Sequence, residues 1–291
     1  MEPLISIGIP TYNRPKKLRA ALNCITAQTH RNLDIVISDN ASHGTETEQM
    51  VRAFMKEDPR IRFFRQPENK GSVFNFGFVE RQASSDFFMW AADDDKWESA
   101  NLIEELSRHA LSHTLTFPNC NLSSADNVFK RSHLDVYKDC GTPMEYLLRW
   151  CSHGTGYPLY GLYNRKRMRE ENLSFVFDDD LAYYNEGGFL HRLFLNGKVK
   201  FVPNVYITFS IDSCKPDNEK LVADFKKYFV RTLLIYAQSQ LGATEKEAIY
   251  TTIVDNYSQR LLSLRLSSTR QARLLRQAVK EMRALFQRTI R

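Results

Sequence analysis

The sequence has few cysteines and no long hydrophobic run. Its five cysteines are odd in number, widely spaced and free of any CxxC pair, which argues against a disulfide framework and against a zinc site. We therefore expect a reducing, cytoplasmic environment. No apolar stretch approaches the roughly 20 residues that a membrane-spanning helix requires. The opening residues MEPLISIGIP have neither a basic segment nor a cleavage site, so we expect a first strand there and no signal peptide.

The sequence also lacks an evenly spread excess of charge. Seven basic residues and one acid in segment 270–291 account for the whole formal net charge of +6, which leaves the rest of the chain formally neutral. A nucleic-acid-binding domain would carry basic residues over its body, so we expect no nucleic-acid partner. The apolar and basic residues of 270–291 fall on complementary arcs of a helix. This pattern is typical of a helix lying on an anionic membrane, and equally of one packed on the body or on a second subunit.

Strand and helix patterns alternate in the first half of the chain. Strands are predicted at 4–10, 33–39, 60–66 and 86–92, and helices at 14–28, 44–58, 72–84 and 99–111. This alternation predicts an α/β fold with a mainly parallel sheet and helices on both faces. Further strands are predicted at 114–120 and 198–211, the second broken by Pro203, and residues 218–291 are nearly all helical in pattern.

Three consecutive aspartates, Asp93, Asp94 and Asp95, follow the apolar strand FFMWA. Like charges this close raise one another's pKa, so a positive group is expected beside them. If the stretch is extended, Asp93 and Asp95 share one side, and two carboxylates there suit Mg²⁺ or Mn²⁺. A solvated loop with Asp95 capping the next helix is the alternative. Asp39 also ends a predicted strand, and ligands bind at the carboxyl ends of such strands, so Asp39 and the aspartates are expected to share a crevice.

Four segments, ISIGIPTYNRPKKLRAAL, LDIVISDNAS, ENKGSVFN and SSDFFMWAADDDKWE, occur in order and resemble family-2 glycosyltransferases of the GT-A fold. The resemblance covers roughly residues 4–100, and four motifs in order are far more specific than any one alone. It implies a Rossmann-like α/β fold with a C-terminal helical extension. It also implies a transferase domain at 1–215, with a nucleotide-binding half at 1–113 and an acceptor half at 114–215, followed by a helical region at 216–291.

The resemblance implies a nucleotide-sugar site in the first half of the chain. The positions that match it are Pro10, Thr11, Tyr12, Arg14, Asp39, Asn69, Gly71, Asp93 and Asp94. Among these, Asp39 matches the carboxylate that hydrogen-bonds the base. Asp93 and Asp95 match the ends of the family's DxD motif, which holds the ribose and a diphosphate-bound Mn²⁺ or Mg²⁺. As structural alternatives, Tyr12 is a packing residue and Gly71 a turn glycine.

The second half must supply the acceptor site and a catalytic base. Family members often carry Glu-Asp before a helix, with an arginine six residues after the Asp and then a glycine. Glu186 stands six residues before Arg192, with Gly197 beyond it, so it matches the base position with Asp replaced by Glu. A carboxylate there would take the proton of the attacking hydroxyl in a single, inverting displacement. Asp180 is the alternative base, or an N-cap if a helix begins at Leu181.

One departure from the family refines the expected function. The segment GSVFNFGF has Asn75 but lacks the arginine of the common A-R-N-x-G run, and so resembles a subgroup of bacterial surface-polysaccharide transferases. The resemblance then implies a metal-dependent inverting transferase that moves a sugar from a nucleotide-sugar donor to a glycan or lipid-linked glycan acceptor in O-antigen, lipopolysaccharide or capsule synthesis. A UDP-sugar is the expected donor, with dTDP- and GDP-sugars as alternatives.

Two other functions stay open at this point. A sugar nucleotidyltransferase would want a glycine-rich phosphate loop after the first strand, and IPTYNRP contains no glycine. A catalytically degenerate GT-A domain would serve as a binding or scaffold module, against which Asp39, Asp93, Asp95 and Glu186 argue. The sequence also leaves open a homo-oligomer and a peripheral place on the inner face of the cell membrane.

Overall fold

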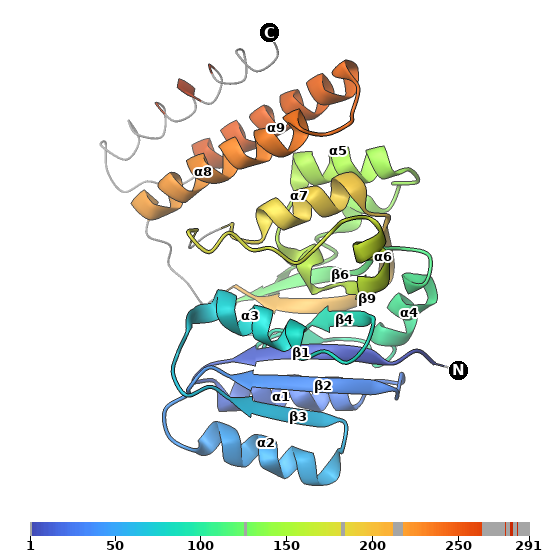
Figure 1. The fold of residues 1–291 in the computed structure, drawn as a ribbon, viewed down its shortest axis with the longest axis vertical. Coiled ribbons are helices and arrows are strands. Elements are labelled where there is room, and N and C mark those ends of the chain that lie inside the picture. Colours follow the sequence, from blue (N-terminus) through green and yellow to red (C-terminus); the bar gives the residue numbers. More distant parts are fainter. Residues whose placement is uncertain are drawn as a thin grey trace. The chain divides into compact units, whose positions relative to one another are not determined.

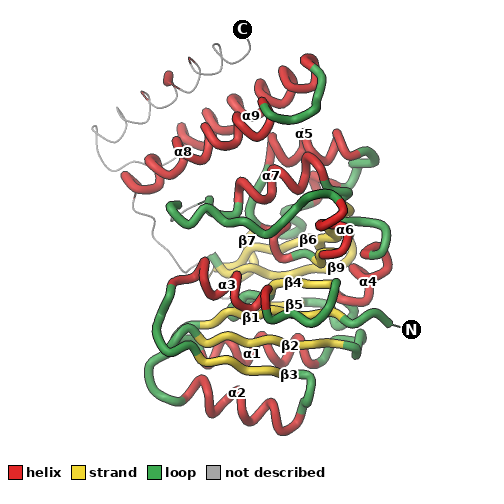
Figure 2. Tube along the Cα trace, in the orientation of Figure 1, coloured by secondary structure: helices red, strands yellow, loops and turns green. Residues whose placement is uncertain are grey.

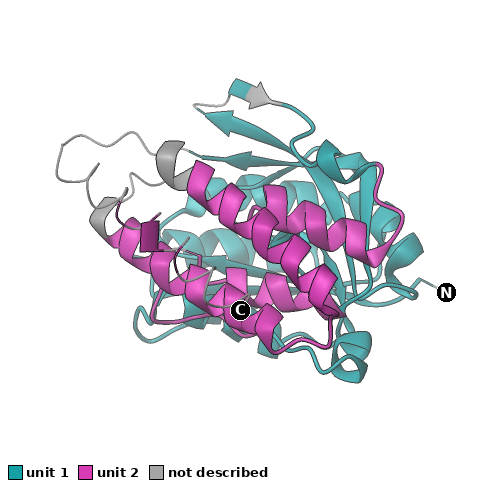
Figure 3. Ribbon diagram, turned by 90° about the horizontal axis from the view of Figure 1, so that it is seen from above, with its two compact units in different colours: residues 1–138, 157–175, 197–213 teal, residues 139–156, 176–196, 214–291 magenta. Residues whose placement is uncertain are grey.

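The computed structural model describes residues 2–124, 127–181, 184–211 and 218–263, together with Gln277, Lys280, Glu281 and Ala284. Two compact units are built from interleaved segments of the chain, as Figure 3 shows by colour. The sheet unit comprises 1–138, 157–175 and 197–213, and the helical unit comprises 139–156, 176–196 and 214–291. The chain therefore passes from one unit to the other five times.

The sheet unit is built on one mixed sheet of nine strands, drawn in yellow in Figure 2. The strands are β1 (Ile5–Thr11), β2 (Leu33–Asp39), β3 (Ile61–Arg65), β4 (Phe87–Trp90), β5 (Lys96–Trp97), β6 (Leu115–Ser124), β7 (Asn127–Lys130), β8 (Leu162–Asn164) and β9 (Val199–Ser210). Their order is β3-β2-β1-β4-β8-β6-β9-β5, with β7 paired to β6. Strands β3, β2, β1 and β4 are parallel, β8 runs antiparallel to both neighbours, β9 is parallel to β6, and β5 is antiparallel to β9.

The parallel strands are apolar because helices cover both faces of the sheet. Ile5, Ile7 and Ile9 of β1 are fully buried, as is Ile35 of β2, and near-continuous apolar runs of this kind are typical of parallel sheets. Thr11, the last residue of β1, pairs in register with Asp39, the last residue of β2. The loops after β1 and β2 therefore leave the sheet side by side.

Five α-helices and two short 3₁₀ helices belong to the sheet unit. They are α1 (Pro15–Thr26), α2 (Glu46–Glu57), α3 (Gly71–Arg81), α4 (Leu102–Ala110), α6 (Arg165–Glu170), η1 (Asp135–Tyr137) and η2 (Tyr157–Tyr160). Helix α3 lies in front of the sheet and α1 behind it in the view of Figure 1. Helix α3 approaches so closely that a Cβ atom on Gly8 of β1 would lie 2.8 Å from the side chains of Val79 and Phe88. Glycine at this position therefore lets α3 sit directly on β1.

The helical unit contains α5 (Pro143–His153), α7 (Gly187–Asn196), α8 (Asn218–Ala237) and α9 (Ala243–Ser263). His191 of α7 lies at its centre and is 1% exposed. The Trp150 indole N–H donates to His191 Nδ1 at 3.1 Å, and the Tyr228 and Tyr257 hydroxyls lie 3.0 and 3.1 Å from Nε2. Because an indole N–H can only donate, Nδ1 carries no proton, and the ring is the neutral tautomer with its proton on Nε2. Hydrogen bonds therefore join α5, α7, α8 and α9 at one residue.

The predicted fold class is confirmed: the protein is α/β, with a sheet that is parallel through β3, β2, β1 and β4, flanking helices, and the helices α8 and α9 after residue 217. The break predicted at Pro203 appears as a shift in register, since Pro118 pairs with Val202 but Asn119 pairs with Tyr206. The helix considered at Leu181 is not present there; the described helix in this region begins at Gly187.

The predicted domain boundary at residue 215 stays a prediction, because the compact units divide the chain differently. Segments 139–156 and 176–196 group with α8 and α9 rather than with the sheet. The reason is packing: α5 contacts α9 and α7, and α7 contacts α8. The predicted helix at 270–291 lies outside the described residues except at four isolated positions. None of the helices in the described ranges is both long and apolar enough to cross a membrane.

Candidate active site

A pocket of about 430 Å³ opens beside the carboxyl ends of β1, β2 and β4 in the sheet unit. It is lined by Pro10, Thr11, Tyr12, Arg14, Asn40, Asn69, Gly71, Ser72, Asn75, Phe76, Ala92, Asp93, Asp94 and Tyr160. Eight of the nine predicted nucleotide-sugar residues are in this set, and Asp39 is the one that is not. Ligands of open α/β sheets bind at this edge. The pocket is therefore the candidate active site.

Asp39 is fully buried next to Asn40, a residue of the pocket wall. Its Oδ1 accepts hydrogen bonds from the backbone N–H and the hydroxyl of Ser42, at 3.0 and 2.5 Å. Its Oδ2 is buried and has no hydrogen-bond partner among the described residues. Buried carboxylate oxygens nearly always have a partner, so Oδ2 lacks a hydrogen bond that a ligand or a water molecule would supply.

Asn40 joins the loop after β2 to the start of α3. Its side-chain amide donates to Asn69 Oδ1 at 2.8 Å and to the Gly71 carbonyl at 3.0 Å, and its Oδ1 accepts from the Lys70 N–H at 3.0 Å. Gly71 has φ +84°, a conformation that favours glycine, and nothing lies within 4 Å of where its Cβ would be. Gly71 thus supplies the positive φ with which the chain enters α3, at the edge of the pocket.

The three aspartates do not alternate as an extended strand would. Strand β4 ends at Trp90, and Asp93 and Asp94 lie in a turn. The Thr11 hydroxyl donates to Asp93 at 2.7 Å, and Arg14 binds both Asp93 and Asp94, at 3.0 and 3.1 Å. The expectation that Asp93 and Asp95 share a side assumed a continued strand; the turn instead brings Asp93 and Asp94 to the pocket.

The positive groups expected beside the aspartates are present. Arg14 contacts two of the carboxylates, and Lys17 Nζ lies 3.3 Å from Asp94. Asp95 is 7% exposed, and its Oδ2 accepts from the Ala92 N–H at 3.2 Å. Burial, followed by the negative charges of Asp94 and Asp93, raises the pKa of Asp95 well above its ordinary value. Burial also raises the pKa of Asp93, against the lowering effects of Thr11 and Arg14.

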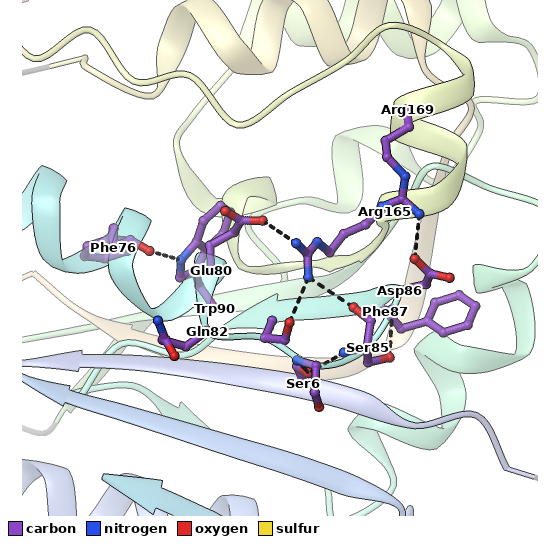
Figure 4. Close-up of polar contacts among 12 residues, drawn as sticks. Ser6, Phe76, Glu80, Gln82, Ser85, Asp86, Phe87, Trp90, Arg165 and Arg169 are labelled. Carbon is purple, nitrogen blue, oxygen red and sulfur yellow. Dashed lines mark hydrogen bonds and ion pairs between the residues drawn. The ribbon is translucent and has the colours of Figure 1, made fainter. Parts of the chain in front are cut away.

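Helix α3 forms one wall of the pocket and is fixed by polar contacts to β4 and α6, shown in Figure 4. The Trp90 indole N–H donates to the Phe76 carbonyl at 3.1 Å. Arg165 pairs with Glu80 near the end of α3 at 3.0 Å and donates to the Ser85 carbonyl at 3.1 Å. These contacts hold the pocket face of α3 at a fixed place beside the sheet.

Several pocket residues were not predicted from the sequence. Asn40 follows Asp39 directly, and its place in the DN pair after β2 was the available signal. Ser72 and Phe76 flank Asn75 on α3, one face of which lines the pocket. Tyr160 belongs to η2, far along the chain, and no local pattern points to it.

The two candidate bases lie in the helical unit and have opposite environments. Glu186 is partly buried before α7, and its carboxyl group lies against Gly156, where an added Cβ atom would be 2.8 Å from Oε1. Burial raises the pKa of Glu186. Asp180 is exposed and binds Arg231 at 2.8 Å and Lys227 at 3.4 Å. Hydrogen bonds from Arg231, with those from Lys227, lower the pKa of Asp180 to about 2.

Solved structures of similar fold include complexes with nucleotides and nucleotide sugars. Staphylococcus aureus TarS (residues 1–349) with UDP matches 97% of this chain and 82% of its own at a TM-score of 0.69 and 14% identity, and the complex with UDP-GlcNAc matches at 0.68. The mannosyltransferase PcManGT of Pyrobaculum calidifontis, with GDP-Man and Mn²⁺, matches 99% of this chain and 84% of its own at a TM-score of 0.57 and 14% identity. At such identities these matches concern the fold alone.

Sequence relatives are also glycosyltransferases. The GalNAc(5)-diNAcBac-PP-undecaprenol beta-1,3-glucosyltransferase of Campylobacter jejuni is 28% identical over 173 residues, which are 58% of this chain and 56% of that protein. Glycosyltransferase GlyG of Streptococcus pneumoniae is 32% identical over 106 residues, 36% of this chain and 35% of its own. The matched part thus spans little more than half of the first relative. A family profile described as "Glycosyl transferase family 2" matches residues 6–178. As the sequence motifs predicted, the chain belongs to glycosyl transferase family 2.

Proposed function

We propose that this protein is a glycosyltransferase that uses a nucleotide-sugar donor, with a UDP-sugar as the leading candidate. The observation that carries the proposal is the pocket at the carboxyl ends of the parallel strands, where Arg14, Asp93 and Asp94 meet. Asp39, whose buried Oδ2 has no hydrogen-bond partner among the described residues, directly precedes Asn40 of the pocket wall. A buried acceptor oxygen suits the imide N–H of a uracil base. TarS, which has a similar fold, was solved with UDP and with UDP-GlcNAc.

A divalent cation, Mn²⁺ or Mg²⁺, is part of the proposal. No group of three or more His, Cys, Asp or Glu side chains in the described part of the chain is arranged to hold an ion alone. The acidic turn nevertheless fits a hard cation that takes its remaining oxygens from a diphosphate and water. Asp93, which lines the pocket, is one proposed ligand; Asp95, the other, is 7% exposed and does not line the pocket, so its carboxylate would have to turn toward the ion on binding. When bound, the cation would stabilise negative charge on the departing diphosphate, and PcManGT was solved with GDP-Man and Mn²⁺.

The residues of the chain itself would then bind the donor and activate the acceptor. Arg14 and Lys17, already placed over the acidic turn, would pair with phosphate oxygens. Glu186 is the proposed base: its raised pKa makes it a better proton acceptor than Asp180, whose pKa of about 2 leaves it a very weak base. The acceptor hydroxyl would attack C1 from the face opposite the diphosphate and invert the anomeric centre.

The acceptor is proposed to be a glycan or a lipid-linked glycan in bacterial surface-polysaccharide synthesis. The support is the Campylobacter relative, whose name contains GalNAc(5)-diNAcBac-PP-undecaprenol. A polyprenyl-linked acceptor is presented at a membrane surface. A peripheral place on the inner face of the cell membrane therefore belongs to the same proposal.

The test is a panel of UDP-, dTDP- and GDP-sugars with Mn²⁺, followed by thermal shift and by release of the nucleotide. We expect one UDP-sugar to raise the Tm and to be turned over, and both effects to be lost in excess EDTA. Asp39→Asn should weaken UDP binding, while Lys56→Ala, an exposed change on α2, should not. Binding without turnover, with any acceptor tried, would favour a degenerate binding module. Full activity in EDTA would exclude the metal role, and binding of no nucleotide would overturn the proposal.

A further inference from the structure

The sheet unit has a second pocket, of about 450 Å³, where β5, β9 and β6 run side by side. The residues of interest in its lining are Lys96, Glu98, Asn121, Arg131, Ser132 and Tyr206. None of them lines the donor pocket, and none of them was singled out in the sequence. The pocket therefore needs its own explanation.

A row of hydrogen bonds connects three lining residues of this second pocket, Ser132, Asn121 and Glu98, through Thr208 of β9, which does not itself line the pocket. Lys96 of β5 pairs in register with Thr208 of β9, and Thr208 with Asn121 of β6, so the three side chains share one face of the sheet. The Ser132 N–H donates to Asn121 Oδ1 at 3.1 Å, Asn121 Nδ2 donates to Thr208 Oγ1 at 3.4 Å, and Thr208 Oγ1 donates to Glu98 at 2.7 Å. Asn121 and Thr208 are only 7% and 5% exposed.

Buried polar side chains are stable only when they are paired, and the hydrogen bonds of Asn121 and Thr208 meet this condition. Here each polar group orients the next, which leaves a pocket of fixed hydrogen-bonding groups with the Tyr206 ring at its side. Hydrogen-bonding groups next to an aromatic ring suit a ligand that carries many hydroxyl groups.

The rim of the pocket carries an excess of positive charge. Lys96 lies 3.1 Å from Glu98, and the Lys96 side chain is 68% exposed. The Arg131 guanidinium is exposed, and it has no hydrogen bond or ion pair with any residue that the structure describes. An unpaired guanidinium presents a planar fork of donors that matches a carboxylate or a phosphate. The rim therefore favours an anionic group.

The two pockets lie on either side of one short turn. Asp94 lines the donor pocket and Lys96 lines the second pocket. Two residues of chain span at most about 7 Å between Cα atoms. A ligand in the second pocket is therefore held next to the segment that faces the donor, as an acceptor has to be.

We propose that the second pocket is an acceptor subsite that takes a hydroxyl-rich ligand bearing an anionic group, either a phosphate or a carboxylate. The assignment of this pocket to the acceptor, rather than to another ligand, rests on the proposed function. The binding itself rests only on Asn121, which Thr208 orients, and on the rim of Lys96 and Arg131.

The test is saturation-transfer difference NMR on the full chain, with α-glucose 1-phosphate, glucuronate and glucose as probes. We expect an anionic probe to bind and neutral glucose to bind at least about tenfold more weakly, the scale of one charge-assisted contact. Arg131→Ala and Lys96→Ala should each weaken the anionic probe by a similar factor, and Arg131→Lys should restore part of the loss. Lys56→Ala is the matched control. The two anionic probes separate a phosphate from a carboxylate ligand.

Several results would overturn the subsite. The first is that neither anionic probe binds up to 50 mM, and the second is that glucose binds as tightly as the anionic probes. The third is a signal that is lost in Arg14→Ala but kept in Arg131→Ala, which would place the probe in the donor pocket. UDP binding, measured by calorimetry on the same variants, separates this failure from failure of the proposed function. If wild type and Arg131→Ala bind UDP equally while no probe binds, the donor site stands and the subsite does not.

Discussion

At the scale of single residues, the environment of each carboxyl group decides what it can do. Arg231 and Lys227 hold Asp180 in an exposed ion-pair cluster and lower its pKa to about 2. Within the described residues no cation pairs with Glu186, and burial raises the pKa of Glu186. The surroundings of these two carboxylates, six residues apart in the chain, thus shift their pKa values in opposite directions, which is why we propose Glu186 and not Asp180 as the base.

Exchanging each carboxylate for its amide separates the two candidates. We expect Glu186→Gln to keep donor affinity and to lower the rate of transfer by about 10²- to 10⁴-fold, the range of general-base catalysis. Asp180→Asn is the matched control and should keep nearly the full rate. The measurements are kcat for transfer and Kd for UDP. A loss of transfer in Asp180→Asn with an active Glu186→Gln would reverse the assignment.

The raised pKa of Glu186 also predicts a pH dependence. The base must be ionised, so kcat/KM should fall as the pH falls through the raised pKa, with a midpoint above the ordinary value of 4.5. The stability of the protein should change with pH in the opposite direction. A pKa that is higher in the folded than in the unfolded state stabilises the folded state at a pH below the unfolded-state pKa. This stabilisation is lost as the pH rises through the folded-state pKa. A pH profile of kcat/KM with its acid midpoint at or below 4.5, in protein that remains folded, would contradict this role for Glu186.

The sequence predicted the residues of the donor pocket better than their orientation. Pro10, Thr11 and Asp39 end strands, and parallel register alone brings strand ends together. The orientation of Asp95 could not be predicted, because it depends on β4 ending at Trp90 and on the turn that follows. Arg14 was predicted as a nucleotide-sugar residue, but its pairing with the aspartates, and that of Lys17, could not be predicted, because these partners lie some 80 residues away.

At the scale of elements, α3 determines the shape of the donor pocket. Its N-terminal turn contributes Gly71 and Ser72, and Asn75 and Phe76 follow one turn later. Asn75 Nδ2 donates to the Ser38 carbonyl at 3.0 Å, and its buried Oδ1 has no hydrogen-bond partner among the described residues. The helix is therefore tied to the sheet on one side and offers a free acceptor near the pocket.

Trp90→Phe tests whether the hydrogen bond that fixes α3 to β4 contributes to donor binding. The change keeps an aromatic ring and removes the hydrogen bond to the Phe76 carbonyl. We expect it to lower the free energy of unfolding by about 1–3 kcal/mol and to weaken UDP binding several-fold. Trp150→Phe is the matched control, since it removes the bond to His191 in the helical unit. It should cost similar stability and leave UDP affinity unchanged. Equal UDP affinity in all three proteins would show that Trp90 serves stability alone.

At the scale of the whole molecule, the helices after residue 217 were predicted, but the other helices that pack with them were not. The periodicity of 218–263 indicates helices, and the structure has α8 and α9 there. No sequence pattern indicates that α5 and α7 pack with α8 and α9, because that contact is made by residues such as Trp150, His191 and Tyr257, which are far apart in the chain. Long-range packing of this kind leaves no local pattern.

The basic segment 270–291 carries a prediction for the molecule as a whole. Its arcs of arginine and of apolar side chains would hold the protein on an anionic bilayer, since each basic residue near the surface contributes up to about 1 kcal/mol. We expect the full chain to co-sediment with vesicles of anionic lipid, and a chain ending at Ser268 to stay in the supernatant. Vesicles of neutral lipid are the control. Equal behaviour of the two chains would favour a helix packed on the body or on a second subunit.

The interleaving of the two units also has a consequence for how the protein is made. Strands β1 to β4 are all present once residue 90 has been synthesised, so the parallel part of the sheet can begin to form early. Strand β6 must wait for β9, because Leu115 pairs with Val199, 84 residues later. At roughly 5–20 residues per second, that wait is about 4–17 s. A growing chain therefore carries one unpaired edge of β6 through several seconds of translation, and this edge is where a ribosome-bound chaperone would be needed.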